Sequence, residues 1–404
     1  MTGTTWQRNL AVGFVSELLA MTAFTFVDPL IPLYIQKVGD LSIQQAAFWA
    51  GIAASGLGIA MFFISPVWGI LADRYGRKPM VLRAMFGGAV VLTLMAFAPN
   101  VWVIVILRWF QGLLTGSVAA ITALASSIAP RDRVSFAMGI TMLAVFSGGS
   151  LGPIIGGFVA DHYGYQTTFY LSGGFLLVGG MIVLFMLKED FQRPIQSKIN
   201  PFRGMVNLSM SKQMLPLLAI MCLVSVGQSM VNPIISLRVK EINALGKAAT
   251  TSGLIFSLTG VMAAISSLIG GRLGQRISLP KIMAFCIFVI GLLYLPMMWA
   301  GTIGLFAVFI ILTGLLRGGQ ATSTNSLVGQ SVTKEEQGIA YGLGQSASSL
   351  GGGMGPLIGG ALAGALGLSP IFAISAGIFI ISGFLTMRLL FGSSTTQPGI
   401  TSEA

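Results

Sequence analysis

The sequence is short of the residue types from which catalytic and metal sites are built. It has two cysteines and one histidine in 404 residues, and only 9% of its residues are charged. The parts of a metal centre or of a Ser-His catalytic site are therefore missing. A GxxxxGK[ST] phosphate-binding loop is also missing, so ATP is not expected as the direct energy source. The sequence predicts a protein that is not an enzyme and that uses no cofactor and no metal.

Apolar residues are what the sequence has in quantity. Its mean hydropathy is +0.85, and apolar runs long enough to cross a bilayer recur along its whole length. We predict twelve membrane spans, at roughly residues 9–36, 47–71, 80–98, 101–128, 136–160, 167–187, 214–237, 249–271, 282–299, 303–329, 337–366 and 369–391. The prediction is an all-α integral membrane protein with no soluble domain.

The positions of the lysines and arginines indicate how the chain is oriented in the membrane. With the N-terminus in the cytoplasm, most of the 23 Lys and Arg residues fall on cytoplasmic segments, as the positive-inside rule expects. We therefore expect no nucleic-acid partner, and a multi-pass protein of the plasma membrane, monomeric, with both termini cytoplasmic. The predicted parts are an N-terminal six-helix bundle (1–187), a cytoplasmic linker (188–213), a C-terminal six-helix bundle (214–391) and a polar cytoplasmic tail (392–404).

The chain contains an internal repeat. Gly148–Gly157 (GGSLGPIIGG) recurs as Gly351–Gly360 (GGGMGPLIGG), with seven of the ten residues identical, and the Asp-Pro of Asp28 recurs as an Asn-Pro at Asn232. Because two distant markers keep their spacing, whole halves were duplicated. Membrane proteins with two like halves are commonly secondary transporters, with the substrate path between the halves.

A charged motif joins the second and third predicted spans. It reads Gly-Ile-Leu-Ala-Asp-Arg-Tyr-Gly-Arg-Lys and contains Gly69, Asp73, Arg74, Gly76, Arg77 and Lys78. Here the sequence resembles the major facilitator superfamily, whose gate motif G-x-L-A-D-R-x-G-R-[KR] it matches. The glycines would permit close helix approach and a tight turn, and the resemblance implies a latch between the halves. Topology alone would also explain the basic residues. In the second half, Gln275 replaces the motif aspartate, so any latch is asymmetric.

Few ionisable residues lie within the predicted spans. Arg108, in an Arg-x-x-Gln-Gly motif with Gln111, should face a wet cavity or a partner because an arginine in a span is costly; burial against carbonyls is the alternative. Arg317 is its displaced counterpart. Glu17 and Asp28 share one face of the first span, with Asp28 near the depth of Arg108. A carboxylate in such a cavity can exchange a proton for a cationic substrate. These three residues, Glu17, Asp28 and Arg108, are the predicted proton-coupling group, although Asp28 could instead cap a helix end.

The repeated glycine segment also resembles a motif of this family. The pattern G-x-x-x-G-P-x-x-G-G is associated there with antiporters, and here it comprises Gly148, Gly152, Pro153, Gly156 and Gly157, repeated in part by Gly355 and Pro356. Glycines at four-residue spacing allow close packing, which alone would explain them, and a proline invites a bend. Four amides and one arginine, all costly within a membrane span, are candidates for the substrate cavity: Gln111, Gln228, Asn232, Arg317 and Asn325.

The resemblance covers residues 9–391 and implies two pseudo-symmetric six-helix bundles, the major facilitator fold, that rock about a central cavity. It is nearest to the bacterial twelve-span drug:proton antiporters, which implies export of amphipathic, often cationic compounds in exchange for protons. Two alternatives stay open at this stage. One is proton-coupled or facilitative transport of a sugar or other small metabolite, and the other is a transporter-like sensor without net transport. Fold analogy alone cannot name the substrate.

Overall fold

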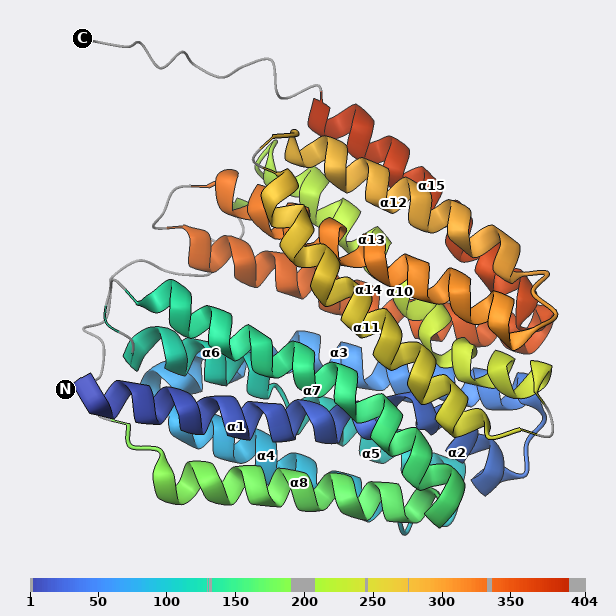
Figure 1. The fold of residues 1–404 in the computed structure, drawn as a ribbon, viewed down its shortest axis with the longest axis horizontal. Coiled ribbons are helices and arrows are strands. Elements are labelled where there is room, and N and C mark those ends of the chain that lie inside the picture. The colour runs from blue at the N-terminus through green and yellow to red at the C-terminus, as the bar shows by residue number, and fades with distance from the viewer. Residues whose placement is uncertain are drawn as a thin grey trace.

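The computed structural model describes residues 3–128, 130, 133–189, 208–243, 246–274, 276–332 and 336–391. Its regular elements in these residues are all helices (Figure 1). Eleven helical stretches in this part of the chain are long and apolar enough to cross a membrane, and a shorter apolar helix, Val101–Leu114, lies among them. The predicted all-α, multi-pass membrane architecture is confirmed.

The helices of the first half pack together and form the lower part of the molecule in Figure 1. Their bounds are α1 (Gly3–Val27), η1 (Asp28–Leu30), α2 (Ile31–Gly39), α3 (Ile43–Tyr75), α4 (Arg77–Met95), α5 (Val101–Leu114), α6 (Ser117–Ile128), α7 (Val134–Tyr163) and α8 (Tyr165–Met186).

The helices of the second half pack together in the upper part of the same view. Their bounds are α10 (Met214–Ile242), α11 (Ala248–Leu273), α12 (Leu279–Met297), α13 (Ile303–Gln330), α14 (Gln337–Leu366) and α15 (Ser369–Phe391). Residues 190–207 of the predicted linker and the whole predicted tail lie outside the described residues.

Two predicted spans are not the uninterrupted helices that the sequence suggested. The first span runs from α1 through a 3-10 turn, η1, into α2, because Pro29 and Pro32 lack the backbone N–H groups that a regular helix needs. The fourth, predicted as one helix over 101–128, is broken into α5 and α6 at Thr115 and Gly116. Gly116 has φ +112, which a helix cannot accommodate and which glycine adopts most readily.

Glycines of the repeated segment pack α7 against α1. A side chain at Gly148 or Gly156 would lie 2.7 Å from the carbonyl of Leu18 or 2.3 Å from that of Phe26, so only glycine fits. The second half repeats this contact between α14 and α10: a side chain at Gly355 would lie 2.5 Å from a carbonyl of α10. The helices α7 and α14 each continue through their internal proline.

The two halves meet along two helix pairs, α3 with α14 and α7 with α11. Backbone approaches backbone there, as at Gly58 and Gly353. Polar contacts cross the interface toward the Asp40 end, by which we mean the end of the bundle where α2 turns into α3. Lys240 donates to Gln36 at 2.8 Å, and the backbone N–H of Thr250 donates to Asp161 at 2.7 Å. The halves are therefore closed at the Asp40 end.

Toward the opposite end, the Gly76 end, where α3 turns into α4, the same helix faces carry three glycines that are close to no other described residue. Gly69, Gly139 and Gly342 lie on α3, α7 and α14, each eleven residues beyond an interface contact, or about three helical turns. A side chain added at any of the three would meet no atom within 4 Å. The expectation that Gly69 permits close helix approach is therefore wrong for this conformation, because the halves are separated at the Gly76 end.

Candidate functional site

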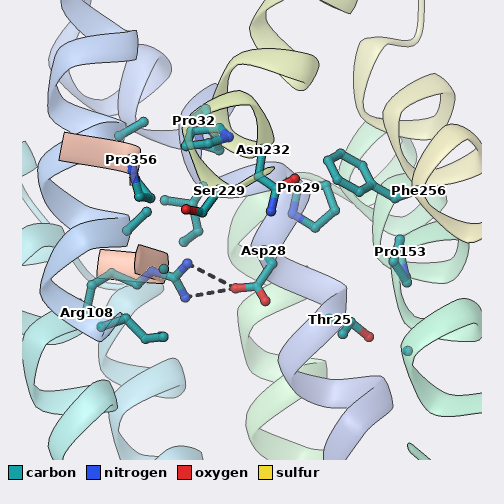
Figure 2. A pocket seen from close by; sticks show the side chains of 17 residues that line it. Thr25, Asp28, Pro29, Pro32, Arg108, Pro153, Ser229, Asn232, Phe256 and Pro356 are labelled. Carbon is teal, nitrogen blue, oxygen red and sulfur yellow. Dashed lines mark hydrogen bonds and ion pairs between the residues drawn. The ribbon is translucent and has the colours of Figure 1, made fainter. Parts of the chain in front are cut away.

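A cavity of about 340 Å³ lies between the two halves, and 17 residues of both line it (Figure 2). Its lining follows the internal repeat. Five pairs of lining residues are related by the repeat offset: Thr25 and Ser229, Asp28 and Asn232, Pro29 and Pro233, Gly149 and Gly352, and Pro153 and Pro356. The cavity therefore lies on the pseudo-two-fold axis that relates the halves, where transporters of this type bind their substrates.

Asp28 and Arg108 are the charged residues that line this cavity. Asp28 stands at the junction of α1 and η1, and Arg108 reaches it from α5. Both terminal nitrogens of Arg108, Nη1 and Nη2, donate to the same oxygen, Oδ1 of Asp28, at 3.0 Å (Figure 2). The carboxylate of Asp28 thus pairs with an arginine and is not a helix cap, since the adjoining helix starts have no side-chain cap hydrogen bond.

The ion pair is buried on one side and wet on the other. The side chain of Arg108 is 6% exposed, whereas that of Asp28 is 50% exposed. Gln111, one turn further along α5, accepts a second bond from Nη1 of Arg108 at 2.9 Å and so orients the guanidinium. The pair uses one carboxylate oxygen, Oδ1, and no described residue donates a hydrogen bond to Oδ2.

Glu17 is not among the residues that line the cavity. Its side chain is fully buried on α1, and its Oε1 accepts a hydrogen bond from the hydroxyl of Ser117, the first residue of α6, at 3.1 Å. Its second oxygen, Oε2, is buried without a partner among the described residues. The two carboxyl groups of the first span are therefore held by different pieces of the fourth span: Asp28 by α5 and Glu17 by α6.

Of the other candidate cavity residues, two lie at the cavity and three do not. Asn232 lines the cavity, and Gln111 supports it through Arg108. Gln228 is half-buried on α10 and is not among the lining residues. Arg317 donates to the hydroxyl of Tyr294 at 2.6 Å, within its own half, and Asn325 is exposed on α13. The structure brings none of these last three into the lining with Asp28: Gln228 lies one helical turn before Asn232 on α10, and Arg317 and Asn325 lie on α13, from which no lining residue comes.

The gate motif forms a tight turn whose described contacts stay within the first half. Gly76 has φ +97 and ends α3, while Arg77 and Lys78 start α4. Their backbone N–H groups donate to Oε1 and Oε2 of Glu189 at 2.7 and 2.8 Å, so this carboxylate caps α4. Arg74 lies over the ring of Tyr75. Asp73 falls in the last turns of α3, and Gln275, its counterpart, lies outside the described residues.

The antiporter motif contributes to both the packing and the cavity. Its glycines at 148, 152 and 156 face α1, while Gly157 approaches the carbonyl of Ala249 on α11, across the interface. Pro153 lines the cavity, and its carbonyl faces Gly253 of the other half; Pro356 lines it too, and its carbonyl faces Gly51. The two prolines thus occupy matching positions on either side of the axis.

Sequence reasoning missed several residues of the site. Thr25 and Ser229 line the cavity as a repeat pair, and applying the repeat offset to every polar residue of the spans would have found them. Glu189 was part of the predicted linker, and no motif identified it as the cap of α4. Arg83 was not among the ionisable residues singled out within the spans, although it lies within a stretch long and apolar enough to cross a membrane, Arg77–Met95.

Comparison with known proteins agrees with this architecture along the whole chain. The model of the Major Facilitator Superfamily matches residues 13–237 and 217–404. The chain is 32% identical over 387 residues to the Multidrug resistance protein MdtG of Salmonella arizonae, over 95% of this chain and 96% of that protein. It is also 32% identical to MdtG of Citrobacter koseri, over 95% of each.

Solved structures share the fold at low sequence identity. A bacterial homologue of the human lysosomal transporter Spinster, in an inward-facing and occupied conformation, matches with a TM-score of 0.83 and 11% identity over 99% of this chain and 100% of that one. A variant of the nucleoside transporter NupG matches with a TM-score of 0.79 and 15% identity over 94% and 99%. The internal repeat, the interhelical cavity on its axis and these matches lead to one conclusion: the chain belongs to the Major Facilitator Superfamily.

Proposed function

We propose that this protein exports amphipathic, cationic drugs in exchange for protons by alternating access. The observation that carries the proposal is the half-exposed carboxylate of Asp28 in a cavity whose lining is otherwise largely apolar. A lipophilic cation needs an apolar surface and an anionic oxygen to contact, and this cavity offers both, since the ion pair with Arg108 uses only Oδ1 of Asp28. The names of the MdtG relatives, which are multidrug resistance proteins, support the same substrate class.

Asp28 is the residue at which proton and substrate compete. A proton on Oδ2 neutralises the carboxylate and weakens its attraction for a cation, whereas a bound cation favours the ionised form and releases the proton. Arg108 and Gln111 hold the carboxylate in place in both situations through Oδ1. Because Glu17 is buried between α1 and α6, it does not contact the substrate and acts on the packing of the helices.

The proposal assigns this structure to the inward-open state of the cycle, which its contacts at the Asp40 end and its separation at the Gly76 end support. In this proposal the Gly76 end and both termini are cytoplasmic and the Asp40 end faces outward, in the plasma membrane, with a single chain as the transporting unit. A drug enters from the Gly76 end and displaces the proton from Asp28 into the cytoplasm. The halves then close at the Gly76 end and open at the Asp40 end, where an external proton replaces the drug. No ATP is needed.

The two motifs act on this movement. The Gly69–Lys78 segment closes the Gly76 end in the outward-open state, where its charged residues reach the second half; the capping of α4 by Glu189 keeps its turn rigid meanwhile. The glycines of α7 and α14 let these helices slide against α1 and α10 without side chains that would interlock. Sugar transport is the less favoured function, because a sugar needs many hydrogen-bonding side chains and the lining supplies few.

The test is proton flux through purified protein in proteoliposomes. A pH gradient is imposed, and a panel of lipophilic cations is added, followed by sugars and nucleosides. We expect cations to trigger proton movement, and the Asp28→Asn protein to show none. The matched control is Gly174→Ala, a substitution on α8 where a side chain meets nothing within 4 Å, which should transport normally. Proton movement triggered by a sugar alone would replace the proposed substrate class, and no flux with any compound would favour a sensor.

A further inference from the structure

The break in the fourth span uses a backbone conformation that glycine supplies. The helix α5 ends at Leu114, the chain turns at Thr115 and Gly116, and α6 begins at Ser117. Gly116 has φ +112, and a side chain added there would come no closer than 3.9 Å to any atom, which is Nη2 of Arg83. Glycine is therefore favoured at this residue by its φ and not by a lack of space for a side chain.

Two side chains occupy the carbonyls that a continuous helix would use. In an unbroken helix, the carbonyl of Leu113 would accept from the N–H of Ser117, and that of Thr115 from the N–H of Ala119. In the structure, the indole N–H of Trp68 donates to the carbonyl of Leu113 at 2.8 Å. Nη2 of Arg83 donates to the carbonyl of Thr115 at 3.1 Å. Since unpaired backbone groups are strongly unfavourable inside a membrane, these two donors make the break tolerable.

Trp68 and Arg83 act as one unit. The guanidinium of Arg83 lies 3.7 Å from the centre of the Trp68 ring, so the residue of α4 and the residue of α3 support each other at the end of α5. A cation at this position also complements the negative end of the α5 dipole. Two further nitrogens of Arg83, Nε and Nη1, are buried without a hydrogen-bond partner among the described residues. An arginine kept at such cost within a span has a function beyond packing.

The two helices of the broken fourth span, α5 and α6, each contact one acidic residue of the first span. On the α5 side, Arg108 binds Asp28, and the hydroxyl of Thr115 bonds back to the carbonyl of Gln111 at 2.7 Å. On the α6 side, Ser117 donates to Glu17. The N–H groups of the first turn of α6 have no partner within that helix, so its positive end lies beside the Glu17 carboxyl. The break thus separates the partner of one acid from the partner of the other.

We propose that Arg83 is a positioning residue for transport: with Trp68 it holds the fourth span broken at Thr115–Gly116, which places the start of α6 against Glu17. The proposal rests on the proposed function in one respect, namely that the first-span acids take part in transport. It adds that the break is a switchable element, in which the carbonyls of Leu113 and Thr115 exchange side-chain donors for backbone donors when the span straightens.

The first test separates turnover from binding. Arg83→Met removes the donor and keeps an apolar stem, and Gly116→Ala favours a straight span because alanine is strained at φ +112. We expect each to lower kcat of cation-driven proton flux at least tenfold, with KM and the Kd of the cation within twofold, because Arg108 and Asp28 stay paired. Arg83→Lys, which keeps a cationic donor, should recover part of kcat, and Gly174→Ala should match the wild type. A fall in binding equal to the fall in kcat would overturn the positioning role.

The second test needs no transport. Hydrogen exchange followed by mass spectrometry reports on the backbone N–H groups of residues 117–119, which start α6 in the wild type and would be hydrogen-bonded in a straight span. Exchange in this segment should slow at least tenfold in both Arg83→Met and Gly116→Ala. Unchanged exchange in Arg83→Met would show that the break does not depend on Arg83 and would refute the proposal. Should Arg83→Met fail to fold, Trp68→Phe, which removes the other donor, takes its place with the same expectation.

These two tests also keep the failures apart. Should the wild type move no protons with any cation, the proposed function fails, while the exchange experiment still decides whether Arg83 holds the break. Should the wild type transport as proposed and the variants behave like it in both assays, the proposed function stands and the role of Arg83 falls.

Discussion

Replacing Asp28 by asparagine removes the cavity carboxylate and disturbs little else. The amide oxygen of asparagine can still accept from Arg108, and Gln111 keeps its own bond to the guanidinium. Breaking a fully buried ion pair costs about 3–5 kcal/mol, but the Asp28 side chain is 50% exposed, and the variant keeps an acceptor. We therefore expect the Asp28→Asn protein to fold, with a modest loss of stability.

The loss in binding of a cation is larger. A close contact with a charged group contributes about 1.5–3 kcal/mol, and each 1.4 kcal/mol changes Kd by a factor of about ten. The Kd of a lipophilic cation should accordingly rise about 10- to 100-fold in Asp28→Asn. An uncharged apolar compound of similar size makes no such contact, so its Kd should change little.

The measurement is a titration of the purified protein with a fluorescent lipophilic cation at two pH values. The proposed competition between proton and cation in the cavity predicts that binding to the wild type weakens at the lower pH. In Asp28→Asn this pH dependence should disappear. Asp40→Asn is the matched control: the same chemical change at an exposed turn, at φ 47, where asparagine is as well tolerated as aspartate. A cation Kd within twofold of the wild type, with its pH dependence intact, would refute the assignment of Asp28.

Three further predictions follow from the same geometry. Glu17→Gln should leave the Kd of the cation unchanged, because Glu17 does not line the cavity, and should lower the turnover of cation-driven proton flux, because it alters the contact of α1 with Ser117 at the start of α6; wild-type turnover in proteoliposomes would contradict it. Gly76→Ala should lower the melting temperature, since a Cβ at φ +97 costs about 1–2 kcal/mol and would lie 2.9 Å from Oε2 of Glu189; Gly174→Ala, the control, should not lower it. Phe256→Leu should weaken binding of flat aromatic cations by about 0.5–2 kcal/mol, the size of a cation–π contact, and leave proton release per bound cation unchanged; an equal loss for aliphatic cations would point to altered packing.

Much of the fold was readable from the sequence because membrane helices obey simple rules. The length of the apolar runs located the spans, and the duplicated glycine segment located the two halves. The proximity of Asp28 to Arg108 was also predictable, since both were placed at a similar depth from the ends of their spans. These inferences need only the rise of a helix and the thickness of a bilayer, so they do not depend on how side chains pack.

The break in the fourth span could not be predicted in the same way. Its apolar pattern continues through Thr115 and Gly116 as it would in a straight helix, and glycine is frequent in membrane helices without breaking them. What stabilises the break is a pair of donors from other helices, Trp68 and Arg83, and such contacts are set by tertiary packing. The conformational state could not be predicted for a related reason. Gly58 and Gly69 lie on one face of α3, but Gly58 approaches Gly353 of the second half and Gly69 has no atom near it. Only the position of the second half makes this difference.

The two halves have matching residues around the cavity but differ in their charged residues, and this difference suits a transporter of many substrates. Five pairs of residues around the cavity obey the repeat, including Pro153 and Pro356, so the movement can be symmetric. The charges are not symmetric, since Asn232 occupies the position that matches Asp28 and the cavity lining from the second half is uncharged. In the proposed mechanism the proton step is thereby confined to the first half, and the second half supplies an uncharged surface. Substitutions on that surface can change which compounds bind without altering the pairing of Asp28 with Arg108, so breadth of substrate and tightness of coupling can vary independently.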